Sequence, residues 1–174
     1  KRAGLNLIDI TKTPIHGNSY VFVFSRVPAT DGKVEQVLAE ERAAGLQDPI
    51  TYLAYADNCK TIVEDLKDTI AHYRSLDYVV CGYGAAAKGM TLLNFGGIEL
   101  DFIIDDNPLK QGRYTPGMHI PVVSIDILEE VKDLKVAFIP LAWNFFTEIT
   151  KNIKQHRTVE GDVFIRYFPT IKVE

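Results

Sequence analysis

The chain has 174 residues, 47% of them hydrophobic and 24% charged, which suits one packed domain with at most an appendage and excludes a disordered chain. Its net charge of −4 argues against a nucleic-acid partner, which would need a basic face. We find no apolar run long enough to cross a membrane and no signal peptide, so we expect no membrane among its partners.

The two cysteines, Cys59 and Cys81, show neither the spacing of metal ligands nor a disulfide framework. Cys81 lies in an apolar, strand-like run, where a buried thiol is expected. Because free thiols fit a reducing compartment, we predict a cytoplasmic protein without a metal site.

Residues 4–26 predict two β-strands joined by a turn. The segment LNLIDI alternates in polarity and SYVFVFS is rich in β-branched and aromatic residues, while Pro14 and Gly17 interrupt the chain between them. A hairpin alone is marginal in water, so this one is expected to need a partner sheet or helix.

Residues 31–74 predict two helices that serve as packing elements. Gly45 suits the position just after the first helix, and Asp48 followed by Pro49 suits the start of the second. An apolar stripe at helical spacing runs along the second helix and comprises Ile62, Leu66, Ile70 and Tyr73.

Residues 77–169 alternate between apolar runs and helical patterns, which predicts an α/β domain with a mostly parallel, Rossmann-like sheet flanked by helices. The predicted strands are 78–81, 100–104, 136–140 and 163–167. The predicted helices are 86–95, 125–132 and 144–155, the last with Phe145, Ile149 and Ile153 on one face. Loops that follow the strands would meet at one edge of the sheet, where ligands of such folds bind.

The first of these loops contains G-x-G-x-x-A at residues 82–87, a form of the dinucleotide-binding motif. Gly82 would permit a tight turn, Gly84 would let a phosphate approach, and Ala87 would allow close helix packing. Asp105 and Asp106 follow about 20 residues later, where an acid can meet a ribose hydroxyl, so NAD fits as well as other nucleotides. A purely structural turn is the alternative.

Lys88 falls in the first turn of the following helix, where a cation is disfavoured unless an anion lies nearby. It is either a phosphate ligand or a solvated surface lysine.

The segment 105–122 is long for a βα connection, and loops of that length are often functional. Lys110 and Arg113 supply positive charge and Tyr114 a flat ring, which favours contact with a diphosphate or a base over an ordinary exposed loop. The segment 139–149 follows another strand and holds the sole tryptophan, Trp143. Asn144 is expected to cap the next helix in any case, and Glu148 faces either the site or water.

Three segments, YGAAAKG, IDDNPLKQGRYTPGMHIPV and LAWNFFTEI, together resemble the C-terminal domain of the S-adenosylmethionine-dependent sugar C-methyltransferases. GLNLIDITKTPIHGNSYVFVFS resembles the last two strands of that family's methyltransferase domain, although Asn18 stands where the family often has a second glycine. The resemblance covers nearly the whole chain.

This resemblance implies a Rossmann-like domain at residues 77–174 that holds the nucleotide diphosphate of a sugar substrate. It further implies a helical connector at 31–76 that packs on the sheet, and a hairpin at 1–30 that ends an upstream methyltransferase domain. His16 is either a contact to the sugar or a turn histidine bonded to backbone. The predicted nucleotide-binding residues are Tyr83, Gly84, Ala85, Lys88, Gly89, Asp105, Asn107, Lys110, Arg113, Trp143 and Asn144.

The family's methyl-donor motif, its cysteine-rich zinc segment and its catalytic-base segment are not found in these residues. We therefore expect a substrate-binding fragment that binds no cofactor alone and does not methylate, with S-adenosylmethionine bound by the full-length protein. Two alternatives remain open. One is an independent NAD(P)-binding protein, and the other is a structural module that forms a homodimer through its hairpin edges.

Overall fold

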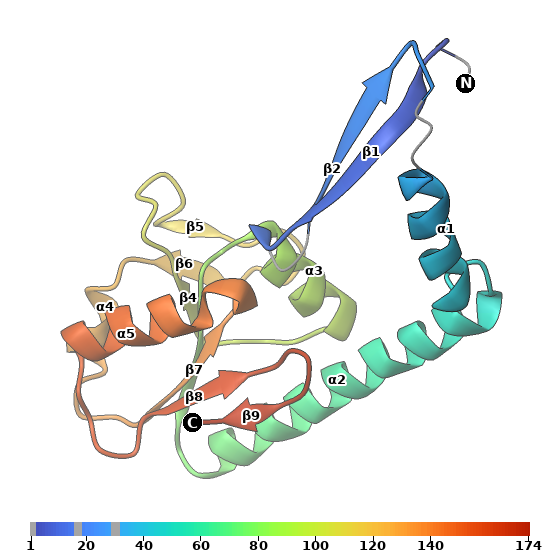
Figure 1. Cartoon of the computed structure of the whole chain (residues 1–174). Coiled ribbons are helices and arrows are strands. Elements are labelled where there is room, and N and C mark those ends of the chain that lie inside the picture. Colours follow the sequence, from blue (N-terminus) through green and yellow to red (C-terminus); the bar gives the residue numbers. More distant parts are fainter. Residues whose placement is uncertain (1–2, 16–18, 29–31) are drawn as a thin grey trace. The chain divides into compact units, whose positions relative to one another are not determined.

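The computed structural model describes residues 3–15, 19–28 and 32–174. The chain forms two compact units, residues 1–57 and 58–174, and helix α2 (Pro49–Ser75) contributes to both (Figure 1). The predicted boundaries at residues 30 and 76 were placed between predicted secondary-structure elements. The division into two compact units depends on packing contacts instead, and it falls between residues 57 and 58, inside α2.

In the first unit, β1 (Asn6–Thr13) and β2 (Ser19–Ser25) pair in antiparallel fashion, which confirms the predicted strands. Helix α1 (Lys33–Ala43) lies against β1. The side chains from Tyr20 to Phe24 are each 40–57% exposed. Both faces of β2 therefore present apolar side chains to solvent, because successive residues of a strand point to opposite faces.

The predicted helix ends are confirmed. Gly45 follows α1 with φ +72°, and its N–H donates to the carbonyl of Arg42 at 3.0 Å. Helix α2 begins at Pro49, and the Asp48 carboxylate accepts the N–H of Ile50 at 2.9 Å. Over the described ranges, no helix is both long and apolar enough to cross a membrane.

The second unit, residues 58–174, contains a seven-stranded sheet in the order β5-β6-β4-β3-β7-β8-β9. The five central strands are parallel, and β5 and β9 pair in antiparallel fashion at the two edges. The strands are β3 (Val79–Tyr83), β4 (Phe102–Ile104), β5 (Arg113–Tyr114), β6 (Pro121–Val123), β7 (Val136–Pro140), β8 (Val163–Arg166) and β9 (Lys172–Val173).

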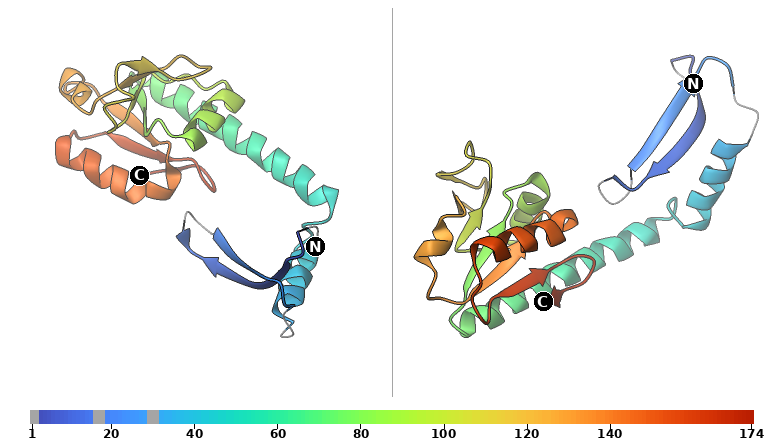
Figure 2. Two further views of the ribbon diagram at one scale, coloured as in Figure 1. Left: turned by 90° about the horizontal axis from the view of Figure 1, so that it is seen from above. Right: turned by 60° about the vertical axis from the view of Figure 1, so that its left-hand side comes forward.

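Two clusters of buried apolar side chains cover the two faces of this sheet. The helices that contribute to them lie on either side of the sheet (Figure 2). On one face pack α3 (Ala87–Gly96) and the second half of α2, whose buried residues are Val63, Leu66 and Ile70. On the other face pack α4 (Ile127–Glu130) and α5 (Phe146–His156). The predicted fold, a mostly parallel sheet with flanking helices after a hairpin and two helices, is confirmed.

The prediction that residues 105–122 form one loop is wrong in part. This segment contains β5 and the start of β6, which adds a parallel strand beyond β4. Strands of two and three residues are too short to show a hydrophobic period, and Pro121 is tolerated because it is the first residue of its strand.

Cys81 is completely buried in β3, as predicted, and burial raises the pKa of its thiol. Cys59 is partly buried in α2, and both thiols are free.

At the amino edge of the sheet, Arg157 and Asp162 form a buried, two-point ion pair, with Nε to Oδ2 at 2.7 Å and Nη2 to Oδ1 at 3.0 Å. The guanidinium also donates to the carbonyls of Val131 and Leu134, and Asp162 accepts the N–H of Val136. These bonds join the end of α4, the start of β7 and the end of α5 at the side of the sheet opposite the carboxyl ends of the parallel strands.

Candidate functional site

Three loops meet at the carboxyl edge of the central strands. Strand β3 pairs with both β4 and β7, so the loops after these three strands are neighbours. The chain runs from β3 outward to β4 and β6 and then returns to β7 on the other side of β3. Open α/β sheets bind ligands where the strand order reverses in this way. The structure thus brings together the three segments that the sequence singled out.

The turn from β3 into α3 is held in a conformation that favours glycine. Gly84 has φ +91° and donates its N–H to the carbonyl of Ile104 at 2.7 Å. The N–H of Ala86 donates to the carbonyl of Gly84 at 2.8 Å. The N-cap residue of α3 is Ala86, whose side chain cannot accept a hydrogen bond. The first backbone N–H groups of α3 are therefore not capped by the N-cap side chain.

The other glycines of this motif have different roles from those predicted. Gly82 lies inside β3 rather than in the turn, and a Cβ there would lie 2.8 Å from Cδ1 of Leu141. Ala87 is exposed, and the close helix contact is made by Gly89, where a Cβ would lie 2.7 Å from Cβ of Leu141. Gly82 in β3 and Gly89 in α3 therefore make room for the side chain of Leu141, the residue that follows β7.

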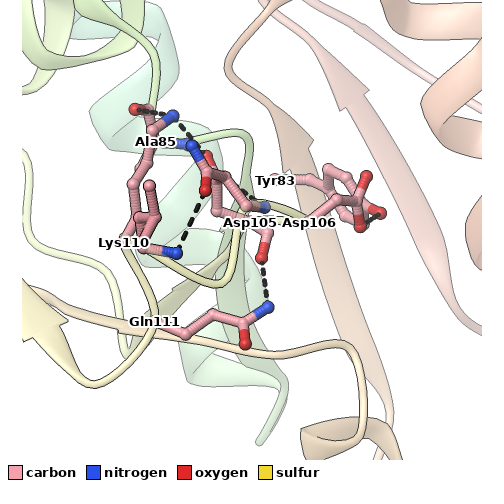
Figure 3. A network of polar contacts seen from close by, with 8 residues as sticks. Tyr83, Ala85, Asp105, Asp106, Lys110 and Gln111 are labelled. Atoms are coloured by element: carbon pink, nitrogen blue, oxygen red, sulfur yellow. Dashed lines mark hydrogen bonds and ion pairs between the residues drawn. The ribbon is translucent and has the colours of Figure 1, made fainter.

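Asp105 braces the turn from the end of β4 (Figure 3). Its carboxylate is 8% exposed and accepts the N–H of Ala85 at 2.7 Å and the N–H of Asn107 at 2.9 Å. The ammonium of Lys110 lies 2.9 Å from Oδ2 of Asp105 and 2.9 Å from the carbonyl of Ala85. One carboxylate therefore fixes the backbone of two loops, with Lys110 as its counter-ion.

Gln111 adds a further tie, because its amide donates to the carbonyl of Asp105 at 2.8 Å (Figure 3). The start of the 105–122 segment is thus bonded to the β3–α3 turn through side chains. Further along, the amide of Asn94 in α3 donates to the carbonyl of Pro116 at 3.1 Å.

Tyr83 ends β3 and is 3% exposed, so it can act on a ligand only through its neighbours. Its hydroxyl donates to Oδ1 of Asp106 at 2.6 Å and accepts from the amide of Asn152 in α5, also at 2.6 Å. Burial, and next the Asp106 carboxylate, raise the pKa of Tyr83 well above its ordinary value.

Trp143 lies on the β7 side of the edge, in a 3₁₀ turn, η2 (Trp143–Phe145). Its ring packs against Phe168 with centroids 4.8 Å apart, and the ammonium of Lys88 lies 5.4 Å from its ring centroid. Lys88 is exposed in the first turn of α3, so this cation–π contact holds its charge beside the helix N-terminus.

The prediction that Asn144 caps the following helix is wrong. Helix α5 begins at Phe146, its N-cap is Phe145, and no side chain caps it, because Asn144 belongs to the preceding 3₁₀ turn. Because α5 begins at Phe146, it is Phe146 rather than Phe145 that is buried with Ile149 and Ile153.

The remaining predicted residues are not all at this edge, and one lies outside the described residues. Asn107 is exposed, and its side-chain oxygen accepts the N–H of Leu109 at 3.0 Å. Arg113 and Tyr114 are exposed on the edge strand β5, and Glu148 is exposed on α5. His16 lies outside the described residues.

The predicted set included Asp105, Lys110 and Tyr83 but missed three residues that bond to them or to each other at this edge. Asp106 was considered as a ribose contact but left out of the predicted site, and Gln111 and Asn152 were not considered. Asn152 precedes the buried Ile153 in α5. An amide next to a buried apolar residue is only a weak sequence signal that its side chain has a buried partner. Its partner, Tyr83, is 69 residues away in sequence, so the pairing follows from the tertiary structure alone.

The site can hold an anion at the first N–H groups of α3, with Lys88 and the Lys110–Asp105 pair alongside. Across the part of the chain that the structure describes, no cluster of His, Cys, Asp or Glu is suited to a metal ion.

The fold and this edge define a Rossmann-like domain with a ligand-binding topology. The chain belongs to the C-methyltransferase C-terminal domain family, whose model matches residues 14–169. It is 33% identical over 159 residues to the C-methyltransferase NovU of Streptomyces niveus. That alignment covers 87% of this chain and 37% of NovU, so the chain spans little more than a third of this relative's length.

Proposed function

We propose that residues 58–174 hold the nucleotide diphosphate of a nucleotide-linked sugar for a C-methyltransferase that uses S-adenosylmethionine. The family and the relative NovU support the methyltransferase context. In this proposal the methyl donor binds to a domain outside these 174 residues, and the full protein works in the cytoplasm.

The observation that carries the proposal is the braced turn at the start of α3. The uncapped helix N-terminus, with the positive end of the helix dipole, is suited to a phosphate group. Asp105 and Lys110 fix the turn before a ligand arrives, which lowers the entropy lost on binding. Lys88 and Trp143 place a cation and an aromatic ring at the same edge.

A thermal-shift and calorimetry panel tests this proposal with thymidine, uridine, guanosine and cytidine diphosphates, NAD and NADP. A ligand that binds the folded state raises the melting temperature, so at least one nucleoside diphosphate is expected to stabilise the chain more than NAD or NADP. If none of the four diphosphates binds at millimolar concentration, the proposal is wrong.

We also propose that the hairpin β1–β2 completes a sheet of an upstream methyltransferase domain. The exposure of Tyr20, Phe22 and Phe24 supports this, because a two-stranded hairpin with such a surface is marginal alone. Its amide hydrogens should exchange quickly in the 174-residue chain and more slowly in a longer protein that includes the upstream domain. Equal exchange rates in the two proteins would contradict it.

The isolated chain is expected not to transfer methyl groups, because this proposal assigns the donor site and the catalytic base to the upstream domain. Incubation with labelled S-adenosylmethionine and sugar nucleotides measures this directly, and any turnover above the background without protein would refute it.

Two other functions predict different results in the same panel. Asp106 is an exposed acid that follows β4, the strand next to β3, and an acid at that position also suits NAD. A NAD-binding protein would be stabilised by NAD and not by thymidine diphosphate. For a dimerisation module, neither ligand would raise the melting temperature, and light scattering would give twice the monomer mass.

A further inference from the structure

Two acids follow β4, and the structure gives them different roles. The Asp105 carboxylate is 8% exposed and already accepts two backbone N–H groups and the ammonium of Lys110. A ligand hydroxyl could reach Asp105 only by displacing bonds that hold the turn. Asp106 is exposed, and Oδ1 accepts the hydroxyl of Tyr83.

The direction of the bonds at Tyr83 follows from chemistry. An ionised carboxylate can only accept, so the single hydroxyl proton of Tyr83 points to Asp106. The Asn152 amide must then be the donor to the Tyr83 oxygen. The result is a one-way chain from Asn152 through Tyr83 to Asp106, which leaves the second carboxylate oxygen of Asp106 as an acceptor for another donor.

An exposed aspartate does not need such a chain for its own solvation. Here Tyr83, which is 3% exposed, orients the Asp106 carboxylate, and the amide of Asn152 in α5 orients Tyr83. Orientation of this kind matters for a group that contacts a ligand, because it reduces the rotamer freedom lost on binding.

The position of Asp106 indicates which ligand group it meets. Tyr83 is level with Ile104 in the β3–β4 pair, so Asp106 lies just beyond the end of β4 and next to the turn that leads into α3. A phosphate at the start of α3 would leave the neighbouring pentose near this carboxylate, and acids after the adjacent strand accept pentose hydroxyls in open α/β sheets.

Building on the proposed function, we propose that Asp106 accepts a hydrogen bond from a pentose hydroxyl of the nucleotide, and that Tyr83 and Asn152 are positioning residues for it. This assignment replaces Asp105 as the pentose contact. It also sets the ligand's direction, with the nucleoside toward β4 and the sugar toward β7 and Trp143.

The test pairs a protein change with the removal of a ligand hydroxyl. Calorimetry compares thymidine diphosphate with its 3′-deoxy analogue, and uridine diphosphate with 2′-deoxyuridine diphosphate, on wild type and Asp106→Asn. Asparagine can keep its oxygen on Tyr83 and turn its NH₂ toward the ligand, so the fold is preserved while the acceptor is lost. Glu130→Gln, an exposed acid on α4, is the control for net charge.

In wild type and in Glu130→Gln, removal of the contacted hydroxyl should weaken binding about 10- to 100-fold, as expected for a hydrogen bond to a charged group. In Asp106→Asn the same removal should weaken binding clearly less than in wild type, because the asparagine amide can only donate a neutral hydrogen bond to the hydroxyl oxygen. If the diphosphates bind but the effect of hydroxyl removal is equal in wild type and Asp106→Asn, the assignment is wrong and the proposed function stands. If no diphosphate binds to wild type, both are wrong.

The positioning role of Tyr83 has its own measurement. Tyr83→Phe should bind the deoxy analogue as wild type does, but lose part of the discrimination between the two ligands. A purely structural tyrosine would lower the melting temperature and leave that discrimination unchanged. Asn152→Leu serves the same purpose if Tyr83→Phe does not fold, and unchanged discrimination in the folded variant refutes the positioning role.

Discussion

Lys110 offers the sharpest test of how the ligand edge is built. Its ammonium lies 2.9 Å from both the Ala85 carbonyl and the Asp105 carboxylate. Lys110→Met keeps the length and apolar stem of the side chain but removes both bonds. If Lys110 acts by bracing the turn, the variant should lose stability even without any ligand.

The magnitude follows from the surroundings of the pair. A hydrogen bond to a charged group contributes about 1.5–3 kcal/mol, but the Lys110 side chain is 41% exposed, so solvent screens part of it. Asp105 also keeps its two backbone donors in the variant. We therefore expect a loss of about 1–2 kcal/mol in the free energy of unfolding. For a chain of this size, that corresponds to a fall of roughly 2–8 °C in Tm.

Urea unfolding and calorimetry of Lys110→Met, with the exposed Lys132→Met as the control, measure this loss. Ligand binding separates bracing from direct contact through a double-mutant cycle with Asp105→Asn. If Lys110 acts through Asp105, the effects of the two changes on diphosphate affinity are non-additive. If it contacts the phosphate itself, the effects add. Unchanged stability in Lys110→Met would refute the bracing argument.

Three further changes test other contacts. Gly89→Ala should destabilise the protein by about 1–3 kcal/mol despite the better helix propensity of alanine, because the new Cβ would lie 2.7 Å from Cβ of Leu141. Arg157→Met should cost about 3–5 kcal/mol, because it leaves the buried Asp162 carboxylate without its cation. Tyr167→Phe should cost about 1–2 kcal/mol at neutral pH through loss of the 2.7 Å bond to the Leu141 carbonyl.

Burial raises the pKa of Tyr167 to about 12 from an ordinary value of 10. The folded state therefore holds this proton more tightly, and the stabilisation from the neutral hydroxyl is complete below pH 10 and is lost as pH rises toward 12. The difference in stability between wild type and Tyr167→Phe should shrink over this range, and a constant difference would contradict the assignment.

The other two changes have equally direct checks. The penalty of Gly89→Ala should be smaller in a Leu141→Gly background than in a Leu141→Ala background, because only glycine removes the Cβ that the new methyl group would meet. A loss of less than about 1 kcal/mol for Arg157→Met would show that the pair is not essential to the fold.

Much of the fold follows from local patterns. The apolar runs that became β3, β4, β7 and β8, and the helices between them, were predictable because buried parallel strands and amphipathic helices repeat over several residues. The ends of α1 and α2 were predictable because Gly45 and the Asp48–Pro49 pair have strong local preferences. Strands β5, β6 and β9 were missed because two or three residues carry no period.

The sequence by itself determined the fold class, the family resemblance and the three loops at the ligand edge. The tertiary structure decided what each residue does there. It buried Asp105 as a brace, placed the close helix contact at Gly89 rather than Ala87, and bonded the Asn152 amide to Tyr83 and the Tyr83 hydroxyl to Asp106. These roles depend on side chains from β3, β4 and α5 that are up to 69 residues apart in sequence and meet only when the sheet forms.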